Sequence, residues 1–350
     1  RQFHQFSAEV FGLDTPEIDA ELILMSAKLW KNLGISTDVR LEINNLGNEE
    51  SRKLYSDALV DFLNKQKSLL DEDTLRKLTE KSIEKNNMDW KSFARSIMTT
   101  DTFPKGIYKK TKIGNKEVKL VGIAKGSGMI APNMATMLGY IFTDANLSSK
   151  ILKELLIEIN EKSFNSITVD SDMSTNDMVC FFSTRQISNN IRTIKDKVLI
   201  KFKKDLQWLA IELAKKIIYD GEGATKLIEI CVFGGNSYLD AKNVALSIAN
   251  SPLVKTAIAG EDANWGRIIM AIGKSKVKLD QDKISLKFGK NIILKKGKLK
   301  KKYNEEVIAK YLKNNEIKIE VDLNHGKFFS KVWTCDLTKK YIEINADYRS

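Results

Sequence analysis

Residues 125–138 read Lys125-Gly-Ser-Gly-Met-Ile-Ala-Pro-Asn-Met-Ala-Thr-Met-Leu138, and this stretch carries the most specific signal in the sequence. Glycines on both sides of Ser127 let the backbone approach another group closely, and Pro132-Asn133 predicts a turn. The hydroxyl of Thr136 could attack the carbonyl of Ala135, and cleavage of the resulting ester would free the α-amine of Thr136. That amine could then act as the base for its own hydroxyl. From this segment alone, Thr136 is more simply explained as a helix residue whose hydroxyl bonds its own backbone than as a catalytic residue.

Strands and helices alternate outward from this stretch, which predicts a layered α/β sandwich followed by a C-terminal α/β domain. Strands are expected at 118–123, 167–169, 178–184, 227–233, 317–323 and 341–345, and near Lys276, Ile284 and Ile292. Helices are expected at 149–162, 194–219, 238–249 and 305–312, and an apolar run covers 134–142. We expect the strands on either side of Thr136 to share one sheet, so that cleaved chains stay associated.

The first part of the chain forms a separate mixed α/β segment in this interpretation. Apolar residues at helical spacing predict a helix from Pro16 to Leu33, with Gly34 ending it. A strand at 39–43 and a helix at 49–65 follow, and the polar stretch Thr79–Asp89 is the candidate boundary. The expected domains are therefore residues 1–78, 79–235 and 236–350.

Composition limits the classes of function. The net charge is +12, but the excess lysine is spread widely without interleaved aromatics, so it does not favour nucleic-acid binding and suits anionic metabolites. The densest run, Lys295–Lys302, is interpreted as a solvated hairpin or loop. The chain contains 3 cysteines, which are far apart and outside any CxxC pattern; this predicts neither disulfides nor zinc and fits a reducing cytoplasm. We expect no membrane span and no targeting signal, and the absent initiator Met suggests a start inside a longer reading frame.

Six colinear segments add to the first stretch. They are Ile97-Met-Thr-Thr-Asp-Thr102 with Pro104-Lys105, Thr168-Val-Asp-Ser-Asp-Met-Ser-Thr-Asn-Asp177, Asp220-Gly-Glu-Gly-Ala-Thr-Lys226, Ala249-Asn-Ser-Pro-Leu-Val-Lys-Thr256, Asn264-Trp-Gly-Arg267 and Ile344-Asn-Ala-Asp-Tyr-Arg-Ser350. Together with the stretch at 125–138, they resemble the ornithine acetyltransferase family, also called bifunctional glutamate N-acetyltransferase. The resemblance covers about residues 82–350.

The resemblance implies a set of site residues. Thr136 would be the nucleophile, exposed by autocleavage between Ala135 and Thr136. The substrate contacts would be Thr99, Lys125, Thr136, Glu222, Asn345 and Ser350, the last replacing the threonine common in the family. Lys125 and Thr99 suit the carboxylate and polar groups of an acylated amino acid, and Glu222 suits an α-ammonium.

The implied reaction is transfer of acetyl from N2-acetylornithine to glutamate, releasing ornithine, with acetyl-CoA as a possible further donor and no cofactor. The implied partners are the α and β chains of one precursor, and we expect a homo-oligomer. In the family, an oxyanion hole is formed by a Thr-Gly pair from an early α-chain region that this sequence does not match. An inactive fusion of two enzyme fragments is therefore the alternative.

Other motifs have ordinary structural explanations. Asp170, Asp172 and Asp177 could bind magnesium, but turn and cap chemistry is favoured. The Asp220-Gly-Glu-Gly sequence lacks Walker spacing. Trp265 and Arg267 could contact a ligand, although a buried Trp beside a helix start is the simpler interpretation. His4 and His325 are the only histidines, so no Ser-His-Asp triad is expected.

The segment before about residue 78 resembles a different family. Arg1-Gln-Phe-His-Gln-Phe-Ser-Ala-Glu-Val-Phe-Gly12, Pro16-Glu-Ile-Asp-Ala-Glu21, Leu41-Glu-Ile-Asn44 and Leu70-Asp-Glu-Asp-Thr74 are similar to a stretch of histidyl-tRNA synthetase. Gln5 and Glu9 match histidine-binding positions there, but the other class II motifs are absent. A histidine- or tRNA-binding remnant is thus a further alternative.

Overall fold

A computed structural model of the chain describes residues 16–32, 34, 90–131, 137–172, 178–301 and 303–346. The chain divides into two compact units, Arg1–Asn87 and Met88–Ser350. In the first unit, α1 (Pro16–Asn32) confirms the predicted helix. The strand predicted at 39–43 and the helix predicted at 49–65 lie outside the described residues.

The second unit contains a four-stranded sheet in the order β1-β2-β3-β5. Its strands are β1 (Lys105–Ile113), β2 (Lys116–Lys125), β3 (Leu138–Ala145) and β5 (Met178–Ile187). The β1–β2 and β2–β3 pairs are antiparallel, whereas β3–β5 is parallel. The prediction that the strands flanking position 136 share a sheet is confirmed, because β2 and β3 are hydrogen-bonded neighbours and Lys125 pairs with Leu138.

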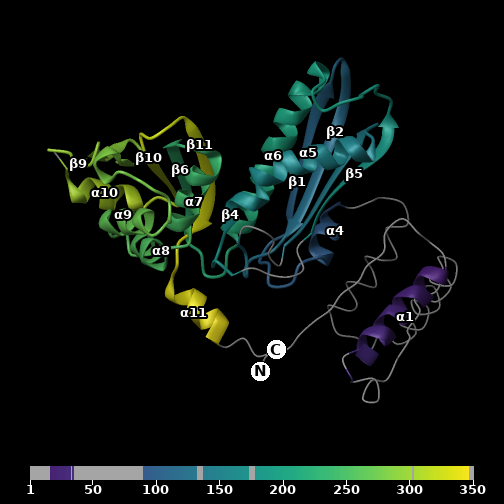
Figure 1. The fold of residues 1–350 in the computed structure, drawn as a ribbon, viewed down its shortest axis with the longest axis horizontal. Coiled ribbons are helices and arrows are strands. Elements are labelled where there is room, and N and C mark those ends of the chain that lie inside the picture. Colours follow the sequence, from purple (N-terminus) through teal and green to yellow (C-terminus); the bar gives the residue numbers. More distant parts are fainter. Residues whose placement is uncertain are drawn as a thin grey trace, which may run out of the picture. The chain divides into compact units, whose positions relative to one another are not determined.

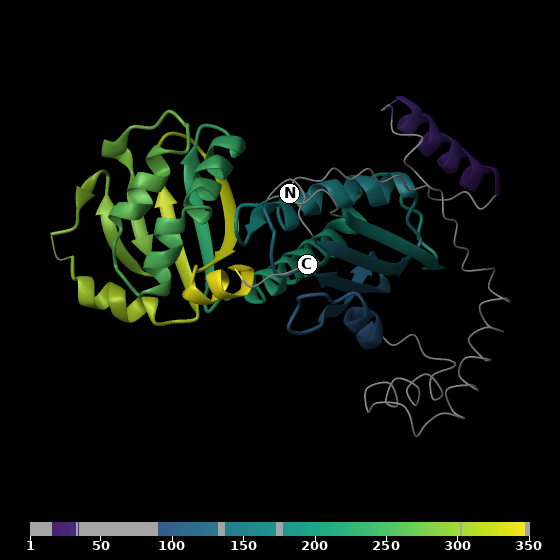
Figure 2. The ribbon, with the colours of Figure 1, turned by 90° about the horizontal axis from the view of Figure 1, so that it is seen from below.

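Helices cover both faces of this sheet (Figures 1 and 2). On one face lie α5 (Ser149–Glu161) and α6 (Ile200–Tyr219), whose apolar sides join the inward residues of the strands in one core. Gly122 on β2 permits this packing, since a Cβ there would lie 2.4 Å from a methyl of Leu213 and 2.6 Å from one of Leu209. On the other face lies α4 (Trp90–Ser96), with Trp90 against Phe142 and Phe93 against Tyr140.

A second sheet of seven strands has the order β4-β11-β6-β10-β7-β8-β9. Its strands are β4 (Ile167–Thr168), β6 (Leu227–Gly235), β7 (Ser285–Phe288), β8 (Asn291–Lys295), β9 (Lys298–Leu299), β10 (Glu316–Asp322) and β11 (Phe328–Cys335). The β6–β10 and β4–β11 pairs are parallel, and the other pairs are antiparallel. The β8–β9 hairpin confirms the interpretation of the lysine-rich run.

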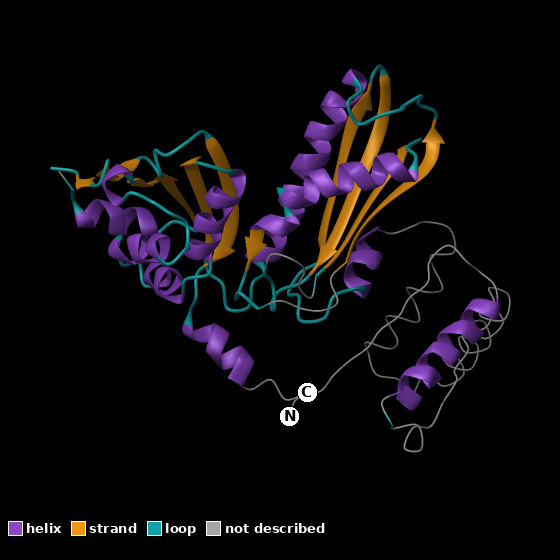
Figure 3. Cartoon of the chain, in the orientation of Figure 1, coloured by secondary structure: helices purple, strands orange, loops and turns teal. Residues whose placement is uncertain are grey.

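The helices associated with this second sheet are α7 (Tyr238–Ala249), α8 (Pro252–Ala259), α9 (Gly266–Gly273) and α10 (Glu305–Leu312), with α11 (Lys339–Ala346) following β11 (Figure 3). Buried residues of α7 to α10 form a second core with the strands. Short 3-10 turns occur at Phe164–Ser166, Lys197–Leu199 and Gln281–Lys283. The predicted layered α/β class is confirmed. The predicted boundary at residue 235 stays a prediction.

Two expected elements were wrong, and one helix begins later than expected. Residues 341–345 belong to the helix α11 rather than a strand, and the Asn345 amide donates to the carbonyl of Tyr341 one turn earlier (3.0 Å). The chain at Lys276 is irregular, with φ of 61°, and not a strand. The helix predicted from Ile194 begins at Ile200, because Asp196 caps a 3-10 turn by accepting from the N–H of Val198 (3.1 Å).

No helix among the described residues is long and apolar enough to cross a membrane.

Candidate active site

Four segments that are distant in sequence meet within the second unit. They are the loop between α4 and β1, the end of β2 with the turn that follows it, the loop between α6 and β6, and the helix α11. Each carries one of the predicted substrate contacts that the structure describes: Thr99, Lys125, Glu222 and Asn345. A continuous set of hydrogen bonds connects these segments.

The first link joins the loop before β1 to the end of β2. Lys125 is the last residue of β2 and is buried, and its ammonium donates to the hydroxyl of Thr99 (3.0 Å). The neighbouring hydroxyls of Thr100 and Ser127 lie 2.7 Å apart and form a second contact between the same segments. The glycines beside Ser127 therefore belong to a tightly packed turn, as the sequence predicted.

The second link joins that turn to Glu222 and then to α11. The N–H of Glu222 donates to the carbonyl of Ser127 (2.9 Å), and its carboxylate accepts from the side-chain amide of Asn345 (2.9 Å). The carboxylate lies directly against Gly128, where an added Cβ would be 2.6 Å from Glu222 Cδ. Only a residue without a side chain leaves the carboxylate in this position.

A buried cluster that sequence reasoning missed lies beneath these contacts. Lys105, the first residue of β1, is fully buried and pairs with the carboxylates of Asp101 (2.5 Å) and Asp220. Asp101 also accepts from the N–H groups of Gly126 (2.7 Å) and Thr99 (3.2 Å). Burial raises the pKa of Asp101, but the bonds from Gly126, Lys105 and Thr99 outweigh it, so its pKa is lower than the ordinary 3.8.

Asp170 has a structural explanation in this geometry. Its carboxylate accepts from the N–H groups of Met129 (2.7 Å) and Ile130 (2.9 Å), and it holds Met129 in the left-handed region with φ of 54°. The hydroxyl of Tyr341 also donates to it (3.3 Å), and burial followed by the charge of Asp170 raises the pKa of Tyr341 to about 12. Asp177 lies outside the described residues, among which no group of acidic, His and Cys side chains could hold a metal ion.

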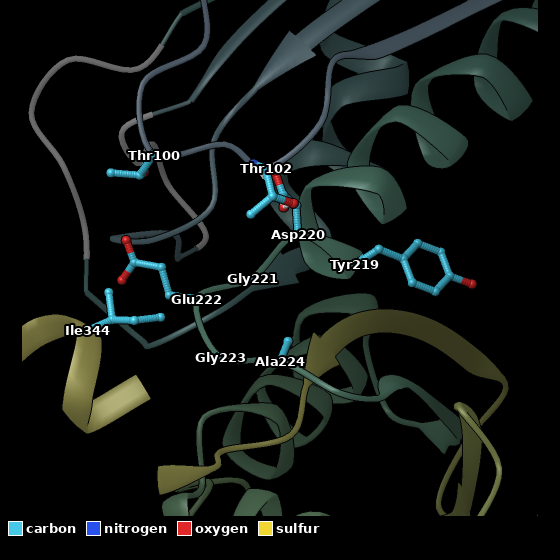
Figure 4. Close-up of a pocket in the computed structure, with 9 residues that line it drawn as sticks. All are labelled: Thr100, Thr102, Tyr219, Asp220, Gly221, Glu222, Gly223, Ala224 and Ile344. Atoms are coloured by element: carbon cyan, nitrogen blue, oxygen red, sulfur yellow. Dashed lines mark hydrogen bonds between the residues drawn. The ribbon is translucent and has the colours of Figure 1, made fainter. Parts of the chain in front are cut away.

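A cavity of about 460 Å³ opens beside these contacts (Figure 4). In Figure 4, the carboxylate of Glu222 and the side chains of Thr100 and Ile344 surround the same space, whereas the ring of Tyr219 points away from them. The lining is completed by Thr102, Asp220, Gly221, Gly223 and Ala224. Two of these lining residues, Thr100 and Ile344, are sequence neighbours of Thr99 and Asn345.

The remaining predicted site residues, Ala135, Thr136 and Ser350, lie outside the described residues. The predicted cleavage position lies in the connection between β2 and β3, and the structure describes both of these paired strands. The N–H of Met178 also bonds to the carbonyl of Met137 (3.1 Å), which ties the chain after this position to β5.

The other sequence candidates lie elsewhere in the second unit and have local roles. Trp265 lies at the start of α9, as expected, but is half-buried rather than buried. Arg267 donates to the carbonyl of Leu253 (2.9 Å). His325 accepts from the N–H of Asp280 (2.9 Å), so its imidazole supports a turn.

The fold and this cavity define an α/β protein with a pocket of small-molecule size, whose lining includes hydroxyl and carboxylate side chains. The sequence profile of the ArgJ family matches residues 67–350. The chain therefore belongs to the ArgJ family. The match begins earlier than the expected start at residue 82. It therefore includes residues 67–78, which were predicted to belong to the synthetase-like segment.

Relatives in two bacteria are each described as arginine biosynthesis bifunctional protein ArgJ. The Gluconobacter oxydans protein is 52% identical over 262 residues, which are 75% of this chain and 62% of that protein. The Zymomonas mobilis protein is 49% identical over 272 residues, which are 77% of this chain and 66% of that protein. The chain thus spans slightly less than two thirds of these relatives.

A solved structure shares this architecture. The crystal structure of the arginine biosynthesis bifunctional protein ArgJ from Bacillus halodurans matches with a TM-score of 0.59 and 44% identity. The match covers 61% of this chain and 100% of the solved chain. This likeness agrees with the mixed α/β fold described above.

Proposed function

We propose that this chain transfers an acetyl group from N2-acetylornithine to glutamate through an acetyl-Thr136 intermediate. The observation that carries the proposal is the pairing of Lys125 with Thr99 and of Asn345 with Glu222, two pairs joined by the backbone bond from Glu222 to Ser127. Glu222 itself lines the cavity. The family resemblance implies all four as substrate contacts, and they come from four segments that are distant in sequence. Their assembly at one place supports a shared role in binding one substrate.

The charges at this place suit an acylated amino acid. The Lys125 ammonium and the Thr99 hydroxyl can together bind a carboxylate, and the Glu222 carboxylate can accept from an ammonium group. Asn345 restrains the Glu222 carboxylate from the other side (2.9 Å). Both N2-acetylornithine and glutamate carry a carboxylate and an ammonium, so one site can receive the donor and then the acceptor.

The first step of the proposed chemistry is maturation. The Thr136 hydroxyl attacks the carbonyl of Ala135, the amide C–N bond breaks, and the chain is joined through an ester. Water then hydrolyses the ester, leaving a carboxylate on Ala135 and a free α-amine on Thr136. This amine can remove the proton from the neighbouring hydroxyl in later turnovers.

Turnover then proceeds in two displacements. The Thr136 oxygen attacks the acetyl carbonyl, the amide bond of acetylornithine breaks, and ornithine leaves with the proton. The amine of glutamate next attacks the acetyl ester, and the Thr136 oxygen leaves and regains a proton. Each half passes through a tetrahedral oxyanion that hydrogen-bond donors would stabilise. No cofactor enters either half, and acetyl-CoA as a second donor remains part of the proposal.

One observation supports the cleavage step. The strands β2 and β3 pair directly, so scission between them would leave both products held in one sheet. These products would be the α and β chains of one precursor, and we propose a cytoplasmic homo-oligomer built from them.

The segment before about residue 78 receives a separate proposal. We infer from its sequence that it derives from a histidyl-tRNA synthetase fragment. Gln5 and Glu9, its predicted histidine contacts, lie outside the described residues. Isothermal titration of the full chain with histidine tests this inference: binding that Glu9→Ala removes supports it, and no heat of binding contradicts a retained histidine site.

The acetyl-enzyme itself provides the test of the proposed reaction. The purified chain is incubated with acetylornithine without glutamate, quenched in acid and measured by mass spectrometry. We expect the fragment that begins at Thr136 to gain one acetyl group, and subsequent glutamate to remove it. Thr136→Ala is the control and should gain none. An unmodified wild-type fragment under saturating acetylornithine would contradict the proposal and favour an inactive fusion.

A further inference from the structure

One buried side chain connects three of the segments that form the candidate site. Lys105 is fully buried, and its ammonium lies between the carboxylates of Asp101 (2.5 Å) and Asp220. Asp101 belongs to the loop that carries Thr99, and Asp220 ends α6 two residues before Glu222. The three charged groups therefore lie under the residues proposed to contact substrate.

Both carboxylates also fix the backbone of these segments. Asp101 accepts from the N–H of Gly126, directly after Lys125, at 2.7 Å. Asp220 accepts from the N–H of Thr102 (3.0 Å) and from its hydroxyl. The loop before β1, the turn after β2 and the loop after α6 are thus all joined to one ammonium.

Charge explains why the lysine matters for this arrangement. Two buried carboxylates repel each other, and the Lys105 ammonium supplies the positive charge that lies between them. Without it, the two segments that carry the carboxylates would separate, or one carboxylate would take up a proton. In either case the bonds to Gly126 and Thr102 would weaken, since a neutral acceptor bonds an N–H less strongly than an ionised one.

We propose that Lys105 is a positioning residue for the acetyl-transfer site, acting through Asp101 and Asp220 to set the spacing of Thr99, Lys125 and Glu222. This inference rests on the proposed function for its kinetic consequence. Its structural consequence, the fixing of two loops by one ammonium, is independent of any reaction.

The same strand offers a matched control. Lys109 also lies on β1 and also pairs with an aspartate of α6, Asp205 (3.4 Å), but this pair is partly exposed. It makes no contact with the loops of the candidate site that the structure records. Lys109→Met therefore removes the same charge and the same type of ion pair from the same two elements.

The first arm of the test measures amide hydrogen exchange in the full chain. We expect Lys105→Met to speed exchange at the N–H groups of Thr102 and Gly126, and Lys109→Met to leave both unchanged. Equal exchange in wild type and Lys105→Met would overturn the inference, whether or not the chain transfers acetyl. If Lys105→Met does not fold, Asp101→Asn, which keeps the side-chain volume, is expected to speed exchange at Gly126.

The second arm measures steady-state kinetics with acetylornithine and glutamate. Displacing binding groups by about 1 Å costs on the order of 100-fold, so we expect that loss in kcat/KM for Lys105→Met with a raised KM. Lys109→Met should stay within about threefold, because partly exposed ion pairs contribute little. A merely structural role would reduce the folded fraction, lowering kcat with an unchanged KM, and that result would overturn the inference. An inactive wild type would instead refute the proposed function and leave the exchange result decisive.

Discussion

Replacing Gly128 by alanine should displace Glu222 while leaving the protein folded. The new Cβ would lie 2.6 Å from Glu222 Cδ and 2.7 Å from each carboxylate oxygen. Because favourable contacts begin near ~3.5 Å, the carboxylate must move by about 1 Å. The atoms that move are the end of a flexible side chain, so the free energy of unfolding should change little. The bond from Asn345 to this carboxylate would be lost or lengthened.

Under the proposed function, Glu222 makes a charged hydrogen bond to the substrate ammonium, and the kinetic effect follows from the loss of that bond. Such a bond contributes about 1.5–3 kcal/mol, which corresponds to a rise in KM of about 10- to 150-fold. Steady-state kinetics with acetylornithine would measure this change, and thermal unfolding would measure stability. Gly273→Ala is the matched control, because no atom lies within 4 Å of its added Cβ. An unchanged KM for Gly128→Ala, with Gly273→Ala behaving as wild type, would refute the assigned position of Glu222.

Two further predictions concern titratable groups. The pKa of Asp101 is lowered in the folded state, so its contribution to stability should be present above its ordinary value of 3.8 and lost as the pH falls through the lower folded pKa. In urea titrations, Asp101→Asn should therefore be less stable than wild type at pH 7, and a difference that grows in acid would contradict this sign. Among the cysteines, burial raises the pKa of all three, that of Cys231 to about 12, but Cys180 alone is half-buried. Iodoacetamide should alkylate Cys180 before Cys231 and Cys335 in the native protein, and earlier labelling of either buried thiol would contradict the packing.

Periodic patterns in the sequence were sufficient to predict the bounds of elements whose buried residues recur at regular spacing. The helix α7 and the helix α10 have the predicted bounds, because their apolar residues recur at helical spacing and a Ser or Asn caps each start. The strand β1 was missed because its sequence, Lys105-Gly-Ile-Tyr-Lys-Lys-Thr-Lys-Ile113, is dominated by lysine. Its burial comes from the long-range contact with α6, which local pattern does not encode.

The segment 341–345 shows the opposite failure. Its alternation of apolar and polar residues predicted a strand, yet it forms the helix α11, whose described side chains are half-buried or exposed and none fully buried. The segment therefore pairs with no described strand, and its alternating pattern does not correspond to a buried sheet face. Local contacts explain the helix instead, since Asn345 bonds both the Tyr341 carbonyl and Glu222. The position of Asn345 beside Glu222 depends on this helix.

The candidate site was predictable only in its individual residues. Motif resemblance nominated Thr99, Lys125, Glu222 and Asn345, and the structure brings these four together. The resemblance did not reveal the buried cluster around Lys105, although Asp101 and Lys105 both belong to the motif at residues 97–105. A fully buried lysine between two carboxylates from distant segments is a tertiary feature, and lysine in a sequence ordinarily indicates exposure.

The intact mass of the purified chain is the decisive measurement for Thr136. We expect two fragments that meet between Ala135 and Thr136 and that elute together under native conditions, since β2 and β3 share a sheet. Thr136→Ala should give one uncleaved mass. A single uncleaved mass for the wild-type chain would contradict the claim that Thr136 becomes an N-terminal nucleophile.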